Sequence, residues 1–194
     1  MMKVSNIRRS TMNFQKEDLY LVVEGEVDEI FLNKILSFIP SKYNVRVRVA
    51  NGNGNIPIHV NILKKIYSYS KIMVLYDLDA NTNMEDLKRY LKNKQVNLKD
   101  EDIFFVNPCI EYLITLTKEV NTNKFKNKRD YSEIFKKYFA IGEYAGHIPQ
   151  VENIVDQLTI NDYNNFVDNL RKVSSNDNVL PSTNFYKFIE RIKK

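Results

Sequence analysis

Leu19-Tyr-Leu-Val-Val-Glu-Gly25 is an apolar run that ends in an acid, and Ile72-Met-Val-Leu-Tyr-Asp-Leu-Asp79 repeats this pattern later in the chain. Runs this apolar are typical of internal strands in a parallel sheet. In open α/β sheets, ligands bind beyond the carboxyl ends of the strands. We therefore expect Glu24, Asp77 and Asp79 to lie along that edge, where their charges repel one another unless a cation is bound. Oxygen ligands suit Mg²⁺ or Mn²⁺, which indicates a metal-dependent enzyme acting on phosphate.

Strands alternate with helices along the first part of the chain. The apolar patterns predict strands at 18–24, 43–50, 72–77 and 103–106, and helices at 27–38, 57–69, 84–93 and 108–116. This alternation predicts an α/β fold whose four-stranded, mostly parallel, Rossmann-like sheet is flanked by helices. A strand order of about 2-1-3-4 would bring strands one, three and four side by side.

Two further acids are expected near the same edge. Glu111 follows the fourth strand in Asn107-Pro-Cys-Ile-Glu111, and Asp28 follows the first strand in Glu24-Gly-Glu-Val-Asp28. Gly25 is expected to let the backbone turn closely there. Turn formation and helix capping are the alternative explanation for each acid alone. Together, such carboxylates can hold one or two Mg²⁺ ions for hydrolysis or transfer at a phosphodiester.

The chain changes character beyond residue 120. No convincing buried strand is predicted there, and helices are expected at 131–139, 150–157, 161–173 and 183–193. We expect a polar lead at 1–17, an α/β domain at 18–120 and a helical extension at 121–194 that packs on the same domain. Ser182 and Thr183 are expected to cap the last helix rather than to act in catalysis.

The bulk composition narrows the class of protein. The chain has 194 residues, of which 43% are hydrophobic, so it is long and apolar enough for one well-packed domain. A net charge of +5 favours a polyanionic partner such as nucleic acid. Cys109 is the only cysteine, which excludes an internal disulfide and favours a reduced, cytoplasmic setting. No segment has the apolar length of a signal peptide or a membrane span, so no membrane association is expected.

Basic residues form several groups that could contact phosphates. The candidates are Arg46 and Arg48 on one face of the second strand, and Lys124, Lys126, Lys128 and Arg129 in a connector. Solvated surface charge is the alternative for each group. Sequence-specific reading of bases is not indicated, because no helix-turn-helix, zinc ligand set or RNA-recognition motif is present. Both histidines, His59 and His147, are expected to be structural or surface residues, and a substrate contact is the lesser alternative for His147.

The motifs Val22-Val-Glu-Gly25 and Asp77-Leu-Asp79 resemble the Toprim domain, the metal-binding fold shared by topoisomerases, primases and OLD-type nucleases. The segments Asn107-Pro-Cys-Ile-Glu-Tyr-Leu113 and Leu180-Pro-Ser-Thr-Asn-Phe-Tyr-Lys-Phe-Ile189 resemble the RloB-like and OLD-like Toprim proteins of bacterial defence and abortive infection. Tyr112-Leu-Ile114 stands where those relatives usually carry an aromatic or Trp-rich stretch, which leaves the substrate open.

The resemblance implies specific roles. Glu24 would be a metal ligand or general acid/base, Asp77 and Asp79 would bind metal, and Asp28 and Glu111 would serve a second metal or its water shell. The implied activity is that of a Mg²⁺- or Mn²⁺-dependent endonuclease on DNA or RNA, transfer RNA included, in phage defence. An ATPase partner would be a separate chain, because no Gly-x-x-x-x-Gly-Lys-Ser/Thr loop is present. A homo-oligomer is compatible with this assignment.

Two alternatives use the same resemblance. A nucleotidyl transferase or primase-type activity would employ the same metals in the reverse chemistry. A non-catalytic Toprim subunit would keep the fold for assembly with an ATPase. A receiver-like phosphoacceptor domain fits less well, since a phosphoaspartate switch explains neither Glu111 nor the C-terminal segment.

Overall fold

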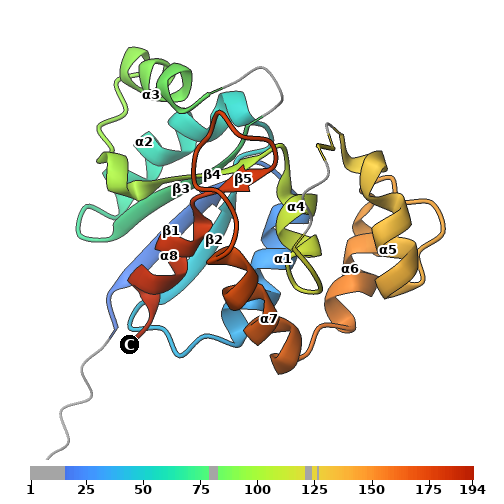
Figure 1. Cartoon of the computed structure of the whole chain (residues 1–194). Helices are drawn as coiled ribbons and strands as arrows, with labels where there is room; N and C mark the ends of the chain where they lie inside the picture. Colours follow the sequence, from blue (N-terminus) through green and yellow to red (C-terminus); the bar gives the residue numbers. More distant parts are fainter. Residues whose placement is uncertain (1–15, 79–82, 121–123, 126) are drawn as a thin grey trace, which may run out of the picture.

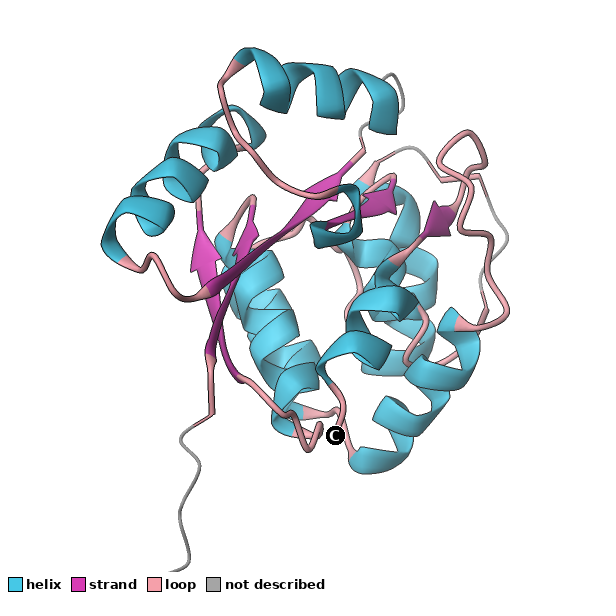
Figure 2. Cartoon of the chain, turned by 90° about the vertical axis from the view of Figure 1, so that its left-hand side faces the viewer, coloured by secondary structure: helices cyan, strands magenta, loops and turns pink. Residues whose placement is uncertain are grey.

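The computed structural model describes residues 16–78, 83–120, 124–125 and 127–194. A sheet lies between two layers of helices (Figure 1, Figure 2). Its strands are β1 (Asp18–Val23), β2 (Asn44–Val49), β3 (Lys71–Asp77), β4 (Ile103–Asn107) and β5 (Ser182–Thr183). The α/β class and the mostly parallel sheet expected from the sequence are therefore present.

The strand order is β2-β1-β3-β4-β5, so the first four strands lie in the order 2-1-3-4. These four are parallel, and β5 is antiparallel to β4. Two expectations were therefore wrong. The sheet has a fifth strand, and this buried strand lies beyond residue 120. A two-residue strand is too short to leave a periodic pattern, and its place depends on pairing of Thr183 with Val106 and of Ser182 with Asn107.

Helices cover both faces of the sheet. On one face lie α2 (Ile56–Ile66) and α3 (Met84–Asn93). On the other lie α1 (Glu26–Ser37), α4 (Ile110–Thr115), α5 (Ser132–Phe139), α6 (Ile148–Asp156), α7 (Ile160–Leu170) and α8 (Phe185–Ile192). None of the helices that the structure describes has both the length and the apolar character needed to span a bilayer.

The alternation of side chains along β1 explains its fully apolar sequence. Leu19, Leu21 and Val23 pack into the larger core cluster, while Tyr20 and Val22 pack under α2 and α3. All five are buried, because β1 has strands on both sides and helices on both faces. Among the described residues, the edge strand β2 has a neighbouring strand on one side only, and its residues are more exposed.

The C-terminal helices contribute to the same core as the sheet. Phe166 of α7 contacts Phe31 of α1 edge-to-face, with ring centroids 5.9 Å apart. Phe188 of α8 likewise meets Phe104 of β4 at 5.4 Å. α7 and α8 thus pack aromatic rings against α1 and β4, and buried residues of α5 and α6 belong to the same core cluster.

Two details at helix starts differ from expectation. The fourth helix begins at Ile110 with Cys109 as its N-cap, so Pro108 precedes the first turn, and the Asn107–Pro108 bond is cis. Thr183 does serve the start of α8, because its Oγ1 accepts a hydrogen bond from the Phe185 N–H at 3.1 Å. Ser182 does not, since its buried hydroxyl has no hydrogen-bond partner among the described residues.

Candidate metal site at the carboxyl edge of the sheet

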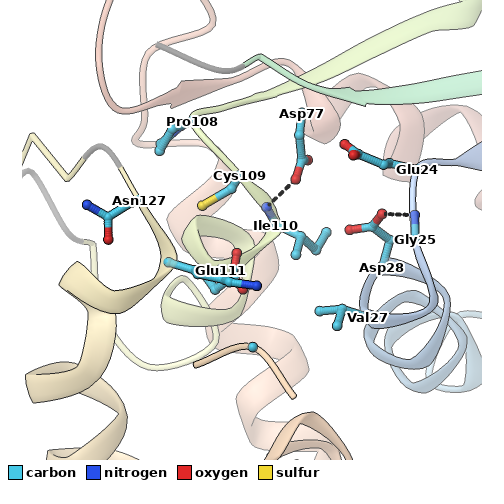
Figure 3. A pocket seen from close by; sticks show the side chains of 12 residues that line it. Glu24, Gly25, Val27, Asp28, Asp77, Pro108, Cys109, Ile110, Glu111 and Asn127 are labelled. Atoms are coloured by element: carbon cyan, nitrogen blue, oxygen red, sulfur yellow. Dashed lines mark hydrogen bonds between the residues drawn. The ribbon is translucent and has the colours of Figure 1, made fainter. Parts of the chain in front are cut away.

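A pocket of about 430 Å³ opens at the carboxyl edge of the sheet, beside the ends of β1 and β3 and the starts of α1 and α4 (Figure 3). Its lining comprises Glu24, Gly25, Val27, Asp28, Asp77, Pro108, Cys109, Ile110, Glu111, Asn127, Lys128 and Gly146. Four of the acids predicted from the sequence therefore meet here. The fifth, Asp79, lies outside the described residues.

Asp28 is held by the turn that joins β1 to α1. Its Oδ2 accepts a hydrogen bond from the Gly25 N–H at 2.7 Å, so it caps the helix in which it is the third residue. Gly25 was expected to let the backbone turn closely here, but its conformation does not require a glycine. Gly25 has an extended backbone with φ of −136°, and a Cβ there would meet Asp28 Oδ2 at an ordinary 3.8 Å. The capping side chain, not the glycine, fixes this turn.

Asp77 connects β3 to α4. It is the last residue of β3, and its Oδ2 accepts a hydrogen bond from the N–H of Ile110, the first residue of α4, at 3.1 Å. The backbone carbonyl of Asp77 accepts from Asn53 Nδ2 at 3.3 Å. Figure 3 shows the carboxyl groups of Asp77, Asp28 and Glu24 turned toward the same space.

Glu111 enters the pocket from the first turn of α4 and is only 4% exposed. Its Oε1 accepts a hydrogen bond from the hydroxyl of Tyr144 at 2.9 Å. Tyr144 belongs to the loop between α5 and α6, and no sequence motif pointed to it. In the same loop, His147 is the exposed N-cap of α6 and does not line the pocket, as expected for a structural or surface residue.

The acids disfavour one another's charged forms. Burial raises the pKa of Asp28 to about 7, and the nearby charges of Glu24 and Glu111 contribute. Burial also raises the pKa of Asp77 well above its ordinary value, with further contributions from Asp28, Glu111 and Glu24. Each shift has the sign expected for carboxyl groups that are buried next to one another.

Cys109 lines the pocket, but its environment does not activate it. Burial raises the pKa of the thiol, and the charges of Glu111 and Asp77 raise it further. A nucleophilic cysteine needs the thiolate form, which positive surroundings favour and these acids oppose. Cys109 therefore contributes packing to the pocket wall.

The donor set suits a hard cation with a partial water shell. As the side chains stand, no three His, Cys, Asp or Glu residues in the described ranges are grouped closely enough to hold a metal ion. Mg²⁺ usually needs fewer than three protein ligands, because one or two carboxylates hold it together with waters and substrate phosphates. Glu24, Asp28, Asp77 and Glu111 supply such oxygens around one pocket. They fit a Mg²⁺ or Mn²⁺ site, which stays a prediction.

Of the predicted basic contacts, Lys128 lines the pocket. Its side chain lies across Gly146, where a Cβ would come within 2.7 Å of Lys128 Cδ and 3.0 Å of Nζ. Gly146 also has a positive φ of 74°, which favours glycine. Figure 3 places the neighbouring Asn127 across the pocket from Glu24.

The other basic candidates lie elsewhere. Lys124 and Arg129 are exposed and do not line the pocket, and Lys126 lies outside the described residues. On β2, Arg46 Nε is 3.6 Å from Asp18 Oδ1, and the Arg48 guanidinium lies over the ring of Tyr20 at 5.6 Å. Neither arginine lines the pocket, so any contact with nucleic acid would be made outside it.

Comparison with protein-family models, curated proteins and solved structures gave no match. The resemblance to Toprim proteins therefore rests on the sequence motifs alone and stays a prediction.

Proposed function

We propose that the protein is a Toprim-like nuclease that uses Mg²⁺ or Mn²⁺ to cleave phosphodiester bonds in DNA or RNA. The observation that carries this proposal is the convergence of Glu24, Asp28, Asp77 and Glu111 on one pocket. The acids come from the ends of β1 and β3 and from the helix after β4, and these three strands are neighbours. This is the edge at which open α/β sheets bind ligands.

The four acids of the pocket, with the predicted ligand Asp79, would be available to one or two ions, and each ion would take one or two carboxylates together with waters and substrate phosphates. When bound, the ion would supply Lewis-acid stabilisation to the oxygens of the reacting phosphate. Without it, four carboxylates in one pocket would repel a phosphodiester. Metal binding is therefore needed for the pocket to accept the substrate class that we propose.

Hydrogen bonds within the protein orient three of the carboxylates that are proposed to bind the metal. One oxygen each of Asp28, Asp77 and Glu111 is fixed, by the Gly25 N–H, the Ile110 N–H and the Tyr144 hydroxyl. Carboxylates fixed in this way lose less freedom when they bind a cation. In the absence of a cation, the pKa of about 7 lets the Asp28 carboxyl take up or release a proton near neutral pH.

Lys128 would meet the substrate from the other side of the pocket. An ammonium group at this wall attracts phosphate and offsets the negative charge of the acids. The contact carries no base information, so the proposal is for binding to the nucleic-acid backbone.

We place this activity in phage defence, with a separate ATPase as partner, on the strength of the RloB-like segments. One structural relationship supports reading these segments as a unit. The first continues from β4 and the second contains β5, and these two strands pair at Val106–Thr183 and Asn107–Ser182. Segments that are far apart in the sequence therefore form one continuous part of the fold, next to the acidic pocket.

The decisive experiment is a cleavage assay with plasmid DNA, single-stranded DNA and transfer RNA, in Mg²⁺, Mn²⁺ or chelator. Wild type should cut at least one substrate in a metal-dependent manner, and Glu24→Gln should not. Glu26→Gln is the matched control, because Glu26 is exposed, lies two residues away and does not line the pocket. Absence of cleavage under every condition, with a neighbouring ATPase added, would refute the nuclease proposal.

The wild-type and variant proteins also distinguish the nuclease from the transferase or primase-type enzyme and from the non-catalytic subunit. Incorporation of labelled nucleotide without cleavage would identify a transferase or primase-type activity. Full biological function in both Glu24→Gln and Asp77→Asn would identify a non-catalytic subunit, since both variants remove acids from the pocket.

A further inference from the structure

A buried tyrosine from the C-terminal part of the chain contacts the acid of α4. The hydroxyl of Tyr144 donates to Glu111 Oε1 at 2.9 Å, and the two side chains are 1% and 4% exposed. Tyr144 and Glu111 are 33 residues apart in the sequence. A buried carboxylate near other acids needs such a donor, because water reaches it poorly.

The surroundings of Tyr144 hold its ring in one place. The ring packs edge-to-face on Phe135 with centroids 4.4 Å apart. The Tyr144 N–H donates to Ser132 Oγ at 3.2 Å, and the Ser132 hydroxyl donates back to the Tyr144 carbonyl at 3.4 Å. The next residue, Ala145, donates its N–H to Gln150 Oε1 at 2.9 Å. The start of α5 and the first turn of α6 thus both anchor this loop.

We propose that Tyr144 is a positioning residue that sets the orientation of the Glu111 carboxylate toward a divalent cation in the pocket. This inference rests on the proposed metal-dependent function. A carboxylate on a two-carbon side chain can rotate about its terminal bond, and a hydrogen bond to one oxygen removes that freedom. Groups that hydrogen-bond a metal ligand typically contribute about 10- to 100-fold to metal affinity.

In this proposal, the C-terminal helices α5 and α6 help to position a metal-binding carboxylate. The other two fixed acids are held by backbone N–H groups of the α/β elements themselves, Gly25 and Ile110. Glu111 is held by the side chain of Tyr144, whose loop is hydrogen-bonded to Ser132 of α5 and Gln150 of α6. Metal affinity should therefore depend on the docking of this helical segment.

The test is Mn²⁺ binding, measured by electron paramagnetic resonance of free Mn²⁺, for wild type and Tyr144→Phe. The substitution keeps the ring and its packing on Phe135 and removes the hydroxyl. Tyr138→Phe is the matched control, because the Tyr138 hydroxyl also donates to a carboxylate, that of Glu119, away from the pocket. We expect Mn²⁺ affinity to fall about 10-fold or more in Tyr144→Phe and to stay unchanged in Tyr138→Phe.

Cleavage measured against Mn²⁺ concentration separates positioning from a general structural defect. A positioning role shifts the Mn²⁺ midpoint of Tyr144→Phe upward, while saturating Mn²⁺ restores most of the wild-type rate. A loss of folded protein lowers the rate at every concentration without moving the midpoint, and that result would overturn the inference. Equal Mn²⁺ affinity in wild type and Tyr144→Phe would overturn it as well.

The outcomes also distinguish this inference from the proposed function. If wild type binds Mn²⁺, Tyr144→Phe binds it weakly and no nucleic acid is cut, the nuclease proposal fails and the positioning role stands. If wild type cuts nucleic acid and Tyr144→Phe binds Mn²⁺ equally well, only the positioning role fails. Absence of Mn²⁺ binding by wild type would overturn both.

Discussion

The Asp77 carboxyl group accepts a hydrogen bond from the backbone N–H of Ile110 at 3.1 Å, which makes it both a pocket acid and the cap of α4. These two roles affect stability in opposite directions. The hydrogen bond stabilises the start of the helix, whereas burial of the charge next to Asp28, Glu111 and Glu24 destabilises the folded state. Substitutions that remove the charge and the hydrogen bond separately can measure each effect.

Asp77→Asn and Asp77→Ala should differ in stability but not in activity. Both should reduce metal-dependent cleavage by about 100-fold or more, equivalent to about 2.7 kcal/mol in the barrier. Asparagine can still accept from the Ile110 N–H, so Asp77→Asn should be at least as stable as wild type at pH 8. Asp77→Ala should be about 1 kcal/mol less stable than Asp77→Asn, because the N–H loses its acceptor. Urea denaturation measures the difference, and equal stability of the two variants would contradict a capping role.

Asp28 should make stability depend on pH. Its pKa is about 7 in the folded protein and about 3.9 in an unfolded chain. Because the folded-state pKa is the higher one, protonation stabilises the fold. That contribution is fully present below about pH 4, is lost as the pH rises toward 7, and changes little above 7. The loss should be on the order of 2–4 kcal/mol.

Asp28→Asn should lack this loss, since asparagine cannot ionise and its oxygen can still accept from the Gly25 N–H. The difference in unfolding free energy between Asp28→Asn and wild type should grow from pH 4 to pH 7. Asp156→Asn, an exposed position at the end of α6 outside the pocket, should show no such growth. Parallel stability curves for Asp28→Asn and wild type would rule out the raised pKa.

Divalent cations should stabilise the folded protein through the same acids. Mg²⁺ at about 100 times its dissociation constant should add about 2.7 kcal/mol, which corresponds to a rise in Tm of roughly 5–10 °C for a chain of this size. Chelator should reverse the rise. Protons compete for Asp28, so the effect should be larger at pH 8 than at pH 5. Thermal melts of Glu24→Gln should show no rise, and a rise equal to that of wild type would place the cation elsewhere.

The convergence of the acids could be predicted because it depends on local patterns and general topology. Fully apolar runs identify internal strands, and parallel strands present their carboxyl ends at one edge. Adjacency of β1, β3 and β4 then brings Glu24, Asp77 and Glu111 together. The local bonds of these acids could not be read in the same way. Asp28 and Asp77 proved to cap helices while lining the pocket, so capping does not exclude the metal site, which stays a prediction.

Features that depend on long-range packing were missed. Tyr144 reaches Glu111 from a loop that is hydrogen-bonded to α5 and α6, and no periodic pattern in the sequence encodes that contact. The two-residue strand β5 is likewise defined by its partner β4. Among the basic residues, the pattern could not separate Lys128, which lines the pocket, from Lys124, which does not.

Lys128 should therefore matter more for nucleic-acid binding than its neighbours do. Lys128→Ala should weaken binding of a labelled oligonucleotide and reduce the slope of log affinity against log salt by about 1, as expected for one lost phosphate contact. Lys124→Ala is the matched control from the same connector. Fluorescence anisotropy over a range of salt concentrations measures both quantities. Equal effects of the two substitutions would indicate a diffuse electrostatic contribution rather than a contact in the pocket.

Gly146→Ala tests the same contact without removing any charge. The added Cβ would lie 2.7 Å from Lys128 Cδ, so the lysine side chain must move away from its position over Gly146. The positive φ of 74° adds strain, on the order of 1 kcal/mol, which a thermal melt can measure separately. We expect Gly146→Ala to weaken oligonucleotide binding as Lys128→Ala does, and the double variant to bind no more weakly than either alone. Additive losses would mean that Gly146 and Lys128 act independently.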